Sequence, residues 1–96
     1  MFVNIVFFPP IKPGKDKAFR EWFAWTNQEF SKYNGFIRRR LLKSVKDDSY
    51  AAIVEHESNE TFMEMQRGSI HDEAHKRVMP LFDGNPTPHF YEVVMG

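Results

Sequence analysis

The stretch FIRRRLLKSVKDDSYAAIVEHE, residues 36–57, decides the fold because it contains two strand-like segments around a turn. Residues 36–45 and 49–57 are rich in apolar, β-branched and aromatic side chains, and the trio Lys46-Asp47-Asp48 between them favours a turn. The two segments are therefore predicted to form an antiparallel hairpin. The run Arg38-Arg39-Arg40 predicts a charged strand with at least one arginine facing water.

A strand and a helix are predicted before the hairpin. Residues 2–8, FVNIVFF, have strand composition and end at Pro9-Pro10. Residues 14–33 have the 3-, 4- and 7-residue spacings of an amphipathic helix, and Asn34-Gly35 supplies the left-handed residue that ends it. The stripe of that helix consists of Phe19, Trp22, Phe23, Thr26, Phe30 and Tyr33.

A broken helix and a last strand are predicted after the hairpin. Ser58 is a helix cap, and the helix that follows breaks near Gly68-Ser69 and resumes until Pro80. The turn-rich DGNPTP leads to a strand at residues 89–95, HFYEVVM. The order β-α-β-β-α-β predicts one α+β domain over residues 1–96, a ferredoxin-like antiparallel sheet with two helices on one face.

Both faces of this predicted sheet are apolar. In the first strand Phe2, Asn4 and Val6 point one way, and Val3 and Ile5 point the other. The helices cover only one face, so the other needs a cover that the chain does not contain. We therefore expect a homodimer that forms through the open sheet face.

Composition excludes several kinds of site and partner. The chain has no cysteine, which excludes disulfides and thiolate metal sites. Its 13 basic and 13 acidic residues argue against a nucleic-acid partner. No segment has the length of about 20 apolar residues that a bilayer span requires, so no membrane partner and a cytoplasmic location are expected.

Three segments resemble the antibiotic biosynthesis monooxygenase superfamily: KPGKDKAFREWF at 12–23, the block at 34–62, and GSIHDEAH at 68–75. The resemblance implies a dimeric α+β barrel. It also implies oxygenation of small aromatic molecules that is cofactor-independent or substrate-assisted, and in one branch the oxidative breakdown of heme.

The resemblance also implies site residues. Asn4 matches the asparagine on the first strand of the heme-degrading branch, and His75 matches the histidine near the end of its second helix. Met65 and His56 occupy positions where that branch has tryptophans, which argues against heme breakdown, although Met65 suits an apolar pocket. His71 corresponds to a histidine at the pocket rim. His75 is therefore expected at the reactive centre, with Asn4 across from it.

Other features of these residues leave alternatives open. Asn4, within an apolar strand, either bonds to neighbouring backbone or points into a pocket. HDEAH resembles a zinc motif, but Asp72 is short and no third ligand follows, so no metal is expected. His56 is a possible pocket residue. Phe23 belongs to the core stripe but is also a candidate for substrate contact, and Trp25 is a candidate for the pocket or the dimer seam.

The sequence thus predicts a dimeric monooxygenase that acts on a small aromatic or tetrapyrrole substrate in an apolar pocket. Asn4 and His75 are the predicted catalytic residues, and Phe23, Trp25, His56, Met65 and His71 are the predicted substrate-binding residues. No cofactor is required unless heme is the substrate. The alternatives are a heme-binding enzyme with His75 as axial ligand, and a small-ligand-binding module without catalysis.

Overall fold

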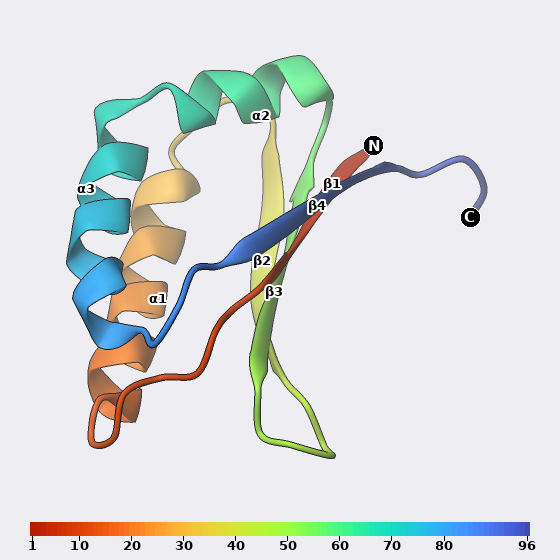
Figure 1. Ribbon diagram of the computed structural model, residues 1–96. Coiled ribbons are helices and arrows are strands. Elements are labelled where there is room, and N and C mark those ends of the chain that lie inside the picture. The colour runs from red at the N-terminus through yellow and green to blue at the C-terminus, as the bar shows by residue number, and fades with distance from the viewer.

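The computed structural model describes all 96 residues and has the predicted order of elements. Helices α1 and α3 lie side by side on one face of a four-stranded sheet, and α2 lies across the top of it (Figure 1). The elements are β1 (Phe2–Phe7), α1 (Asp16–Phe30), β2 (Phe36–Lys43), β3 (Tyr50–His56), α2 (Asn59–Gln66), α3 (Ser69–Val78), the 3-10 turn Met79–Leu81 and β4 (Thr87–Glu92).

The sheet has the antiparallel strand order β2-β3-β1-β4, which confirms the ferredoxin-like α+β fold. β1 is central and pairs with β3 and β4. Its side chains alternate as expected: Phe2 and Asn4 are buried under the helices, whereas Phe7, on the opposite face, is exposed. The sheet therefore has a covered face and an open face.

The hairpin is present, with one irregularity in β2. Phe36 pairs with His56 but Arg38 pairs with Glu55, so Ile37 is an extra residue, a β-bulge. The bulge lets Phe36 and Arg39, three residues apart, face the same helices, which strict alternation forbids. At the turn Asp48 has a φ of 61°, a left-handed conformation that aspartate tolerates.

The helices follow the predicted pattern with a different end for α1. Helix α1 buries four residues of the predicted stripe, but it ends at Phe30 rather than near Tyr33. Gly35 is left-handed, with a φ of 85°, and it leads into β2. The Ser58 hydroxyl accepts a hydrogen bond from the Thr61 backbone N–H, which confirms the predicted cap of α2. The predicted break separates α2 from α3 at Arg67-Gly68.

The last strand differs from its predicted bounds. It begins at Thr87 rather than His89, and it ends at Glu92 rather than Met95. Pro88 is accepted because β4 is an edge strand that needs hydrogen bonds on one side only. The ladder with β1 ends at the pair Phe2 and Glu92, and beyond it the Val93 N–H still donates to the Met1 carbonyl at 2.9 Å, where the chain begins.

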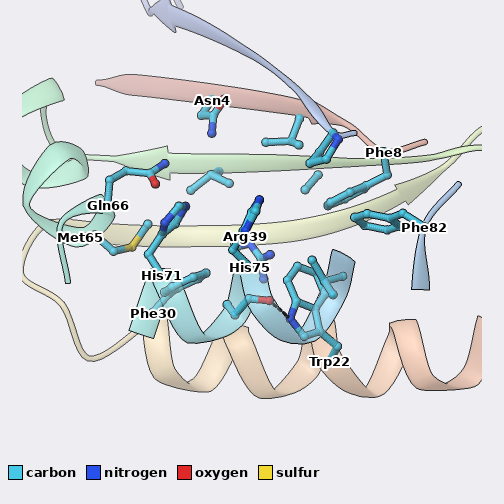
Figure 2. A pocket seen from close by; sticks show the side chains of 16 residues that line it. Asn4, Phe8, Trp22, Phe30, Arg39, Met65, Gln66, His71, His75 and Phe82 are labelled. Atoms are coloured by element: carbon cyan, nitrogen blue, oxygen red, sulfur yellow. Dashed lines mark hydrogen bonds between the residues drawn. The ribbon is translucent and has the colours of Figure 1, made fainter. Parts of the chain in front are cut away.

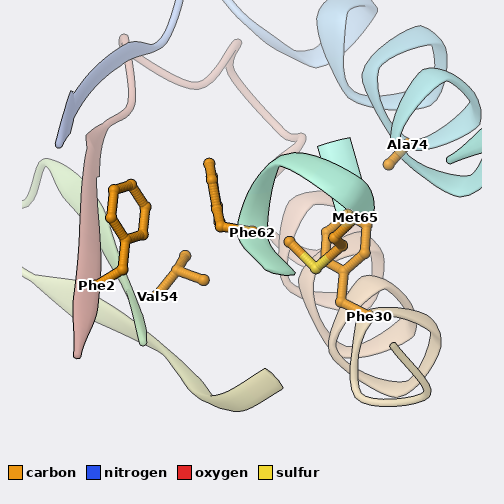
Figure 3. Packing of buried hydrophobic residues seen from close by; sticks show 6 residues of the cluster. All are labelled: Phe2, Phe30, Val54, Phe62, Met65 and Ala74. Atoms are coloured by element: carbon orange, nitrogen blue, oxygen red, sulfur yellow. The ribbon is translucent and has the colours of Figure 1, made fainter. Parts of the chain in front are cut away.

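Two aromatic clusters form the core between sheet and helices. One consists of Phe2, Phe30, Val54, Phe62, Met65 and Ala74 (Figure 3). The other consists of Phe19, Tyr50, Val78 and Phe82. Trp22 packs against both clusters and donates a hydrogen bond from Nε1 to the Ala74 carbonyl at 2.9 Å, which ties α1 to α3. None of the helices has the length and apolar character to cross a bilayer.

Candidate functional site

A cavity of about 120 Å³ lies between the covered face of the sheet and the helices. Asn4 of β1, Val54 of β3 and Arg39 of β2 are register neighbours in one row across three strands, and they form its floor. Adjacent strands are about 4.8 Å apart, so the backbones of Asn4 and Arg39 are separated by about 10 Å. The cavity is lined by Asn4, Val6, Phe8, Trp22, Phe30, Arg39, Ala52, Val54, Met65, Gln66, His71, Ala74, His75, Val78, Phe82 and Pro86.

The two ends of the cavity differ in character (Figure 2). Met65 and Gln66, from the end of α2, lie at one end, and Phe8 and Phe82 lie at the other. Asn4 points from β1 into the space between them, opposite the helices that carry Trp22 and His71. Ten of the 16 lining residues are hydrophobic, so the few polar groups determine what chemistry the cavity supports.

Asn4 has a carboxamide that the protein does not satisfy. Its side chain is only 4% exposed, and its Oδ1 is the one fully buried side-chain polar atom without a hydrogen-bond partner. An unpaired buried acceptor costs about 1 to 3 kcal/mol of stability. Of the two readings left open by the sequence, the structure therefore supports the one in which Asn4 points into a pocket.

Arg39 is the buried cation of the site, and the sequence-based assignment did not include it. One terminal nitrogen, Nη1, donates to Thr26 Oγ1 at 2.7 Å, to Asn27 Oδ1 at 2.9 Å and to the Phe23 carbonyl at 3.5 Å. The guanidinium also lies over the Phe23 ring, 3.9 Å from the centroid. These partners hold the side chain in place, but all of them are neutral.

Burial lowers the pKa of Arg39 to about 9, so its guanidinium remains protonated at neutral pH. A buried charge without a counterion costs several kcal/mol of stability, which the ring contacts and neutral hydrogen bonds offset only in part. Arg38 on the same strand pairs with Glu55 on the open face, and Arg40 is also exposed. Of the three arginines, Arg39 alone faces the cavity.

The two histidines of α3 line the cavity at unequal depth, and the order is the reverse of the one predicted. His71 is half-buried and His75 is exposed. Burial lowers the pKa of His71; Asp72 raises this pKa, and His75 and Arg39 lower it further. His71 is therefore largely neutral near pH 7, and one of its ring nitrogens is free to accept a proton.

The order of the histidines follows from the inward face of α3. Ala74 and Val78 are its buried residues, and they define the direction of the sheet. At 100° per residue, His71 lies about 40° from the centre of the face formed by Ala74 and Val78, and His75 lies about 80° from it on the same side. Spacing by itself indicated that both reach the pocket, but only the packing of Ala74 and Val78 fixes which is deeper.

Met65 lines the cavity as predicted, whereas His56 does not. His56 is fully buried behind the cavity, with Nδ1 3.0 Å from Thr61 Oγ1 and Nε2 3.3 Å from the Met65 sulfur. Burial lowers its pKa, and Glu57 raises it by a smaller amount. His56 therefore connects β3 to α2 and supports Met65 from behind.

The two aromatic candidates on α1 also lie outside the cavity. Phe23 is buried in the core under Arg39 and has no contact with the cavity. Trp25 lies on the outer side of the α1–α3 pair, where the Arg77 guanidinium stacks over its ring at 4.4 Å. It is thus on the face away from the sheet and cannot contribute to a seam at the open sheet face.

Trp22 and Gln66 line the cavity although the sequence did not single them out for it. Trp22 belongs to the predicted core stripe. The sequence does not show whether a residue of that stripe packs against other side chains or lies next to an empty space, so Trp22 was not assigned to the cavity. Gln66 is the last residue of α2, so its place depends on where the helix breaks. Arg39 could have been found by counting back two residues from the apolar Leu41, which places both on one face.

The residues offer little to a metal or to heme. No group of three or more His, Cys, Asp or Glu side chains is placed to bind a metal ion. The cavity of about 120 Å³ is smaller than the roughly 300 Å³ at which pockets for drug-sized ligands begin, and a tetrapyrrole needs more. His75, the predicted axial ligand, is exposed. These residues do not fit heme.

Comparisons with known proteins support the fold through structure and not through sequence. No family model and no curated protein sequence matches the chain. Its structure is similar to that of a presumed antibiotic biosynthesis monooxygenase from Nitrosomonas europaea, at 17% identity and a TM-score of 0.86, over 99% of this chain and 100% of that one.

Two further solved structures give the same result. The presumed antibiotic biosynthesis monooxygenase from Bordetella bronchiseptica has 20% identity and a TM-score of 0.81, with 98% of each chain covered. SnoaB, a cofactor-independent oxygenase from Streptomyces nogalater, has 20% identity and a TM-score of 0.79, with 99% of this chain and 92% of that one covered. The chain therefore has the same fold as these solved structures, two of which are named as antibiotic biosynthesis monooxygenases.

Proposed function

We propose that the protein is a monooxygenase that oxidises a small, electron-rich aromatic molecule inside the cavity without a bound cofactor. The observation that carries this proposal is the pairing of an unsatisfied carboxamide, Asn4, with a half-buried neutral histidine, His71, in a cavity that is otherwise mostly apolar. The structural likeness to SnoaB, a cofactor-independent oxygenase, supports the same class of reaction.

The chemistry is balanced without an external reductant. One molecule of dioxygen is consumed for each substrate, the O–O bond, a C–H bond and a substrate O–H bond break, and one C–O bond forms, so the product is a quinone. The second oxygen atom leaves as water with the two hydrogens, and the substrate supplies all four electrons. The protein contributes a cavity that excludes bulk water and holds the ring, together with a group that accepts a proton.

Two residues have separate roles in this proposal. His71 accepts the proton of a substrate hydroxyl, because it is neutral and lies deeper than His75. Asn4 Oδ1 accepts a hydrogen bond from a second substrate hydroxyl, which satisfies its carboxamide and orients the ring. In this proposal His75, which was predicted as the reactive residue, affects entry of the substrate, because it is exposed and lines the cavity.

The test is oxygen consumption with a panel of one- and two-ring dihydroxyaromatic compounds under labelled dioxygen. We expect uptake above the rate of autoxidation and a product that gains one labelled oxygen atom, detected by mass spectrometry. His71→Ala and Asn4→Ala should each lower kcat by about tenfold or more. His75→Ala should mainly raise KM, and Glu64→Gln, at an exposed position of α2, should match the parent.

Two results would count against this assignment. Uptake equal to autoxidation for every compound, despite measurable binding, would favour the binding module without catalysis. A parent-like His71→Ala together with an inactive His75→Ala would restore the original order of the histidines. Hemin serves as a further probe: a Soret shift with bleaching on reduction would support the heme alternative in spite of the small cavity.

We also propose that two copies of the chain pair through the open sheet face. This face carries the half-buried Ile5 and Ile53 and the exposed Phe7, Leu42 and Tyr91, and no segment of the chain covers it. The C-terminal residues 93–96 run away from the domain on the side opposite α1 and α3 (Figure 1). Val94 and Met95, 93% and 90% exposed, are apolar side chains that a second copy would cover.

A further inference from the structure

We propose that the cavity binds an aromatic anion, with the negatively charged oxygen group of the ligand on Arg39. This inference narrows the substrate class of the proposed monooxygenase and rests on that proposal only in placing the ligand in this cavity. The geometry of Arg39, the charges around it and the size of the cavity support it independently of turnover.

Arg39 retains donors that no protein atom uses. All of its hydrogen bonds to the protein come from Nη1, although a guanidinium carries five N–H groups on three nitrogens. Nε and Nη2 have no protein partner, and the side chain lines the cavity. The N–H groups of these two nitrogens match the two oxygens of a carboxylate, and one of them suffices for a phenolate.

The charge around Arg39 is uncompensated. None of the 16 residues that line the cavity is an aspartate or a glutamate, and Arg39 is their one arginine or lysine. The residue is only 9% exposed, so water screens its charge poorly. Asp16, Glu55 and the other carboxylates that form ion pairs are used by other cations. A ligand with one negative charge would neutralise the site.

The shape of the cavity sets the size of the ligand. A dry cavity of about 150 Å³ is known to accept benzene, so about 120 Å³ with an exposed mouth at His75 suits one aromatic ring. Val54 lies between Asn4 and Arg39 on the floor and provides an apolar surface under the ring. A ring with an anionic oxygen at Arg39 can place a hydroxyl at Asn4, whose Oδ1 lacks a donor.

The experiment is a binding measurement with benzoate and benzamide by calorimetry. The two molecules have nearly the same shape and differ in charge, and neither has the hydroxyls that oxidation requires. We expect the protein to bind benzoate about tenfold or more tightly than benzamide, as a charge-assisted bidentate contact implies. 4-Nitrophenol, whose anion absorbs visible light, then shows whether the site accepts a phenolate as well as a carboxylate.

Arg39→Met and Arg40→Met form a matched pair, because these neighbours on β2 face the cavity and the open face respectively. Arg39→Met should remove the preference for benzoate, and Arg40→Met should keep it. Arg39→Lys retains the charge and should keep part of the preference. If Arg39→Met does not fold, the preference for benzoate over benzamide is compared between Arg39→Lys and the parent, and a weaker preference in Arg39→Lys supports the role of Arg39.

Equal affinity of the parent for benzoate and benzamide would overturn the inference, and so would a preference that survives Arg39→Met. Benzoate binding through Arg39 without oxygen uptake from any dihydroxyaromatic compound would retain the anion site and reject the monooxygenase. Oxygen uptake with a neutral substrate and no preference for anions would retain the monooxygenase and reject the anion site.

Discussion

Asn4 and Asn27 have the same side chain, but only the carboxamide of Asn27 forms hydrogen bonds within the protein at both ends. Asn27 uses both ends of its carboxamide on Arg39, with Nδ2 donating to the backbone carbonyl at 3.1 Å and Oδ1 accepting from Nη1 at 2.9 Å. Asn4 is buried in the cavity floor and has an oxygen that accepts nothing. One asparagine therefore stabilises the folded chain, and the other reduces its stability in favour of a ligand.

Substitution of each asparagine by leucine, which has a similar shape, should separate these roles. Asn4→Leu should leave the free energy of unfolding unchanged or raise it by about 1 kcal/mol, which corresponds to about 4 to 8 °C in Tm. Asn27→Leu should lower it by about 1 to 3 kcal/mol, because Arg39 loses two partners. Thermal melts give the comparison. A large loss of stability for Asn4→Leu would show that its carboxamide has a structural partner.

The buried His56 and the half-buried His71 make stability depend on pH. Burial lowers the pKa of both His56 and His71 below the usual value of 6.5, so the unfolded chain takes up protons first as the pH falls. Stability is therefore complete above about pH 6.5 and decreases as the pH falls through the folded-state values. Melts between about pH 7.5 and pH 5 should show a falling Tm.

The histidine variants identify the source of this pH dependence. His56→Gln or His71→Gln should each reduce the slope of Tm against pH in that interval. An unchanged slope in both the His56 and the His71 variant would assign the dependence to other groups.

Among the elements, those set by local chemistry were predictable from the sequence. Ser58 caps α2 through its own side chain, and the break at Gly68 follows from a residue pair that does not favour a helix. The end of β4 was not predictable, because Val93 has strand composition but lies beyond the first residue of its only neighbour, β1. Arg39 was missed because the run Arg38-Arg39-Arg40 was interpreted as a charged, solvated strand, and the bulge at Ile37 that puts Arg39 on the face of Phe36 is not visible in the sequence.

The junction of β2 and α2 is sensitive to one glycine. Gly35 and Gly14 both have left-handed backbones, with φ of 85° and 79°, but a Cβ on Gly35 would lie 2.4 Å from the Thr61 side chain, and a Cβ on Gly14 would meet nothing within 4 Å. Gly14→Ala should cost about 1 kcal/mol from the backbone alone. Gly35→Ala should cost at least about 3 kcal/mol, because it also displaces Thr61 from the cap and from His56.

Chemical denaturation of the two glycine variants measures this difference directly. Gly14→Ala controls for the backbone conformation, so the excess loss in Gly35→Ala reports the contact with Thr61. Equal losses would mean that the Thr61 side chain moves aside at no cost.

At the scale of the whole molecule, the open sheet face predicts a dimer. Light scattering after size exclusion should give about twice the chain mass of 11.4 kDa at micromolar protein. Ile53→Lys places a charge in the centre of this face and should yield a folded monomer. Val45→Lys, at a fully exposed position of the hairpin turn, should remain dimeric. A parent that is a stable monomer would contradict the proposal.

The central position of β1 has a consequence for synthesis of the chain. Of the four strands of the sheet, β1 is synthesised first, yet Phe2 pairs with His56 and Glu92, so its second partner is made last. At 5 to 20 residues per second, the uncharged segment FVNIVFF waits on the order of 5 to 20 s for that partner. Such a segment has the composition that aggregates when left unpaired. The yield of soluble protein should therefore increase when a chaperone that holds nascent chains is supplied.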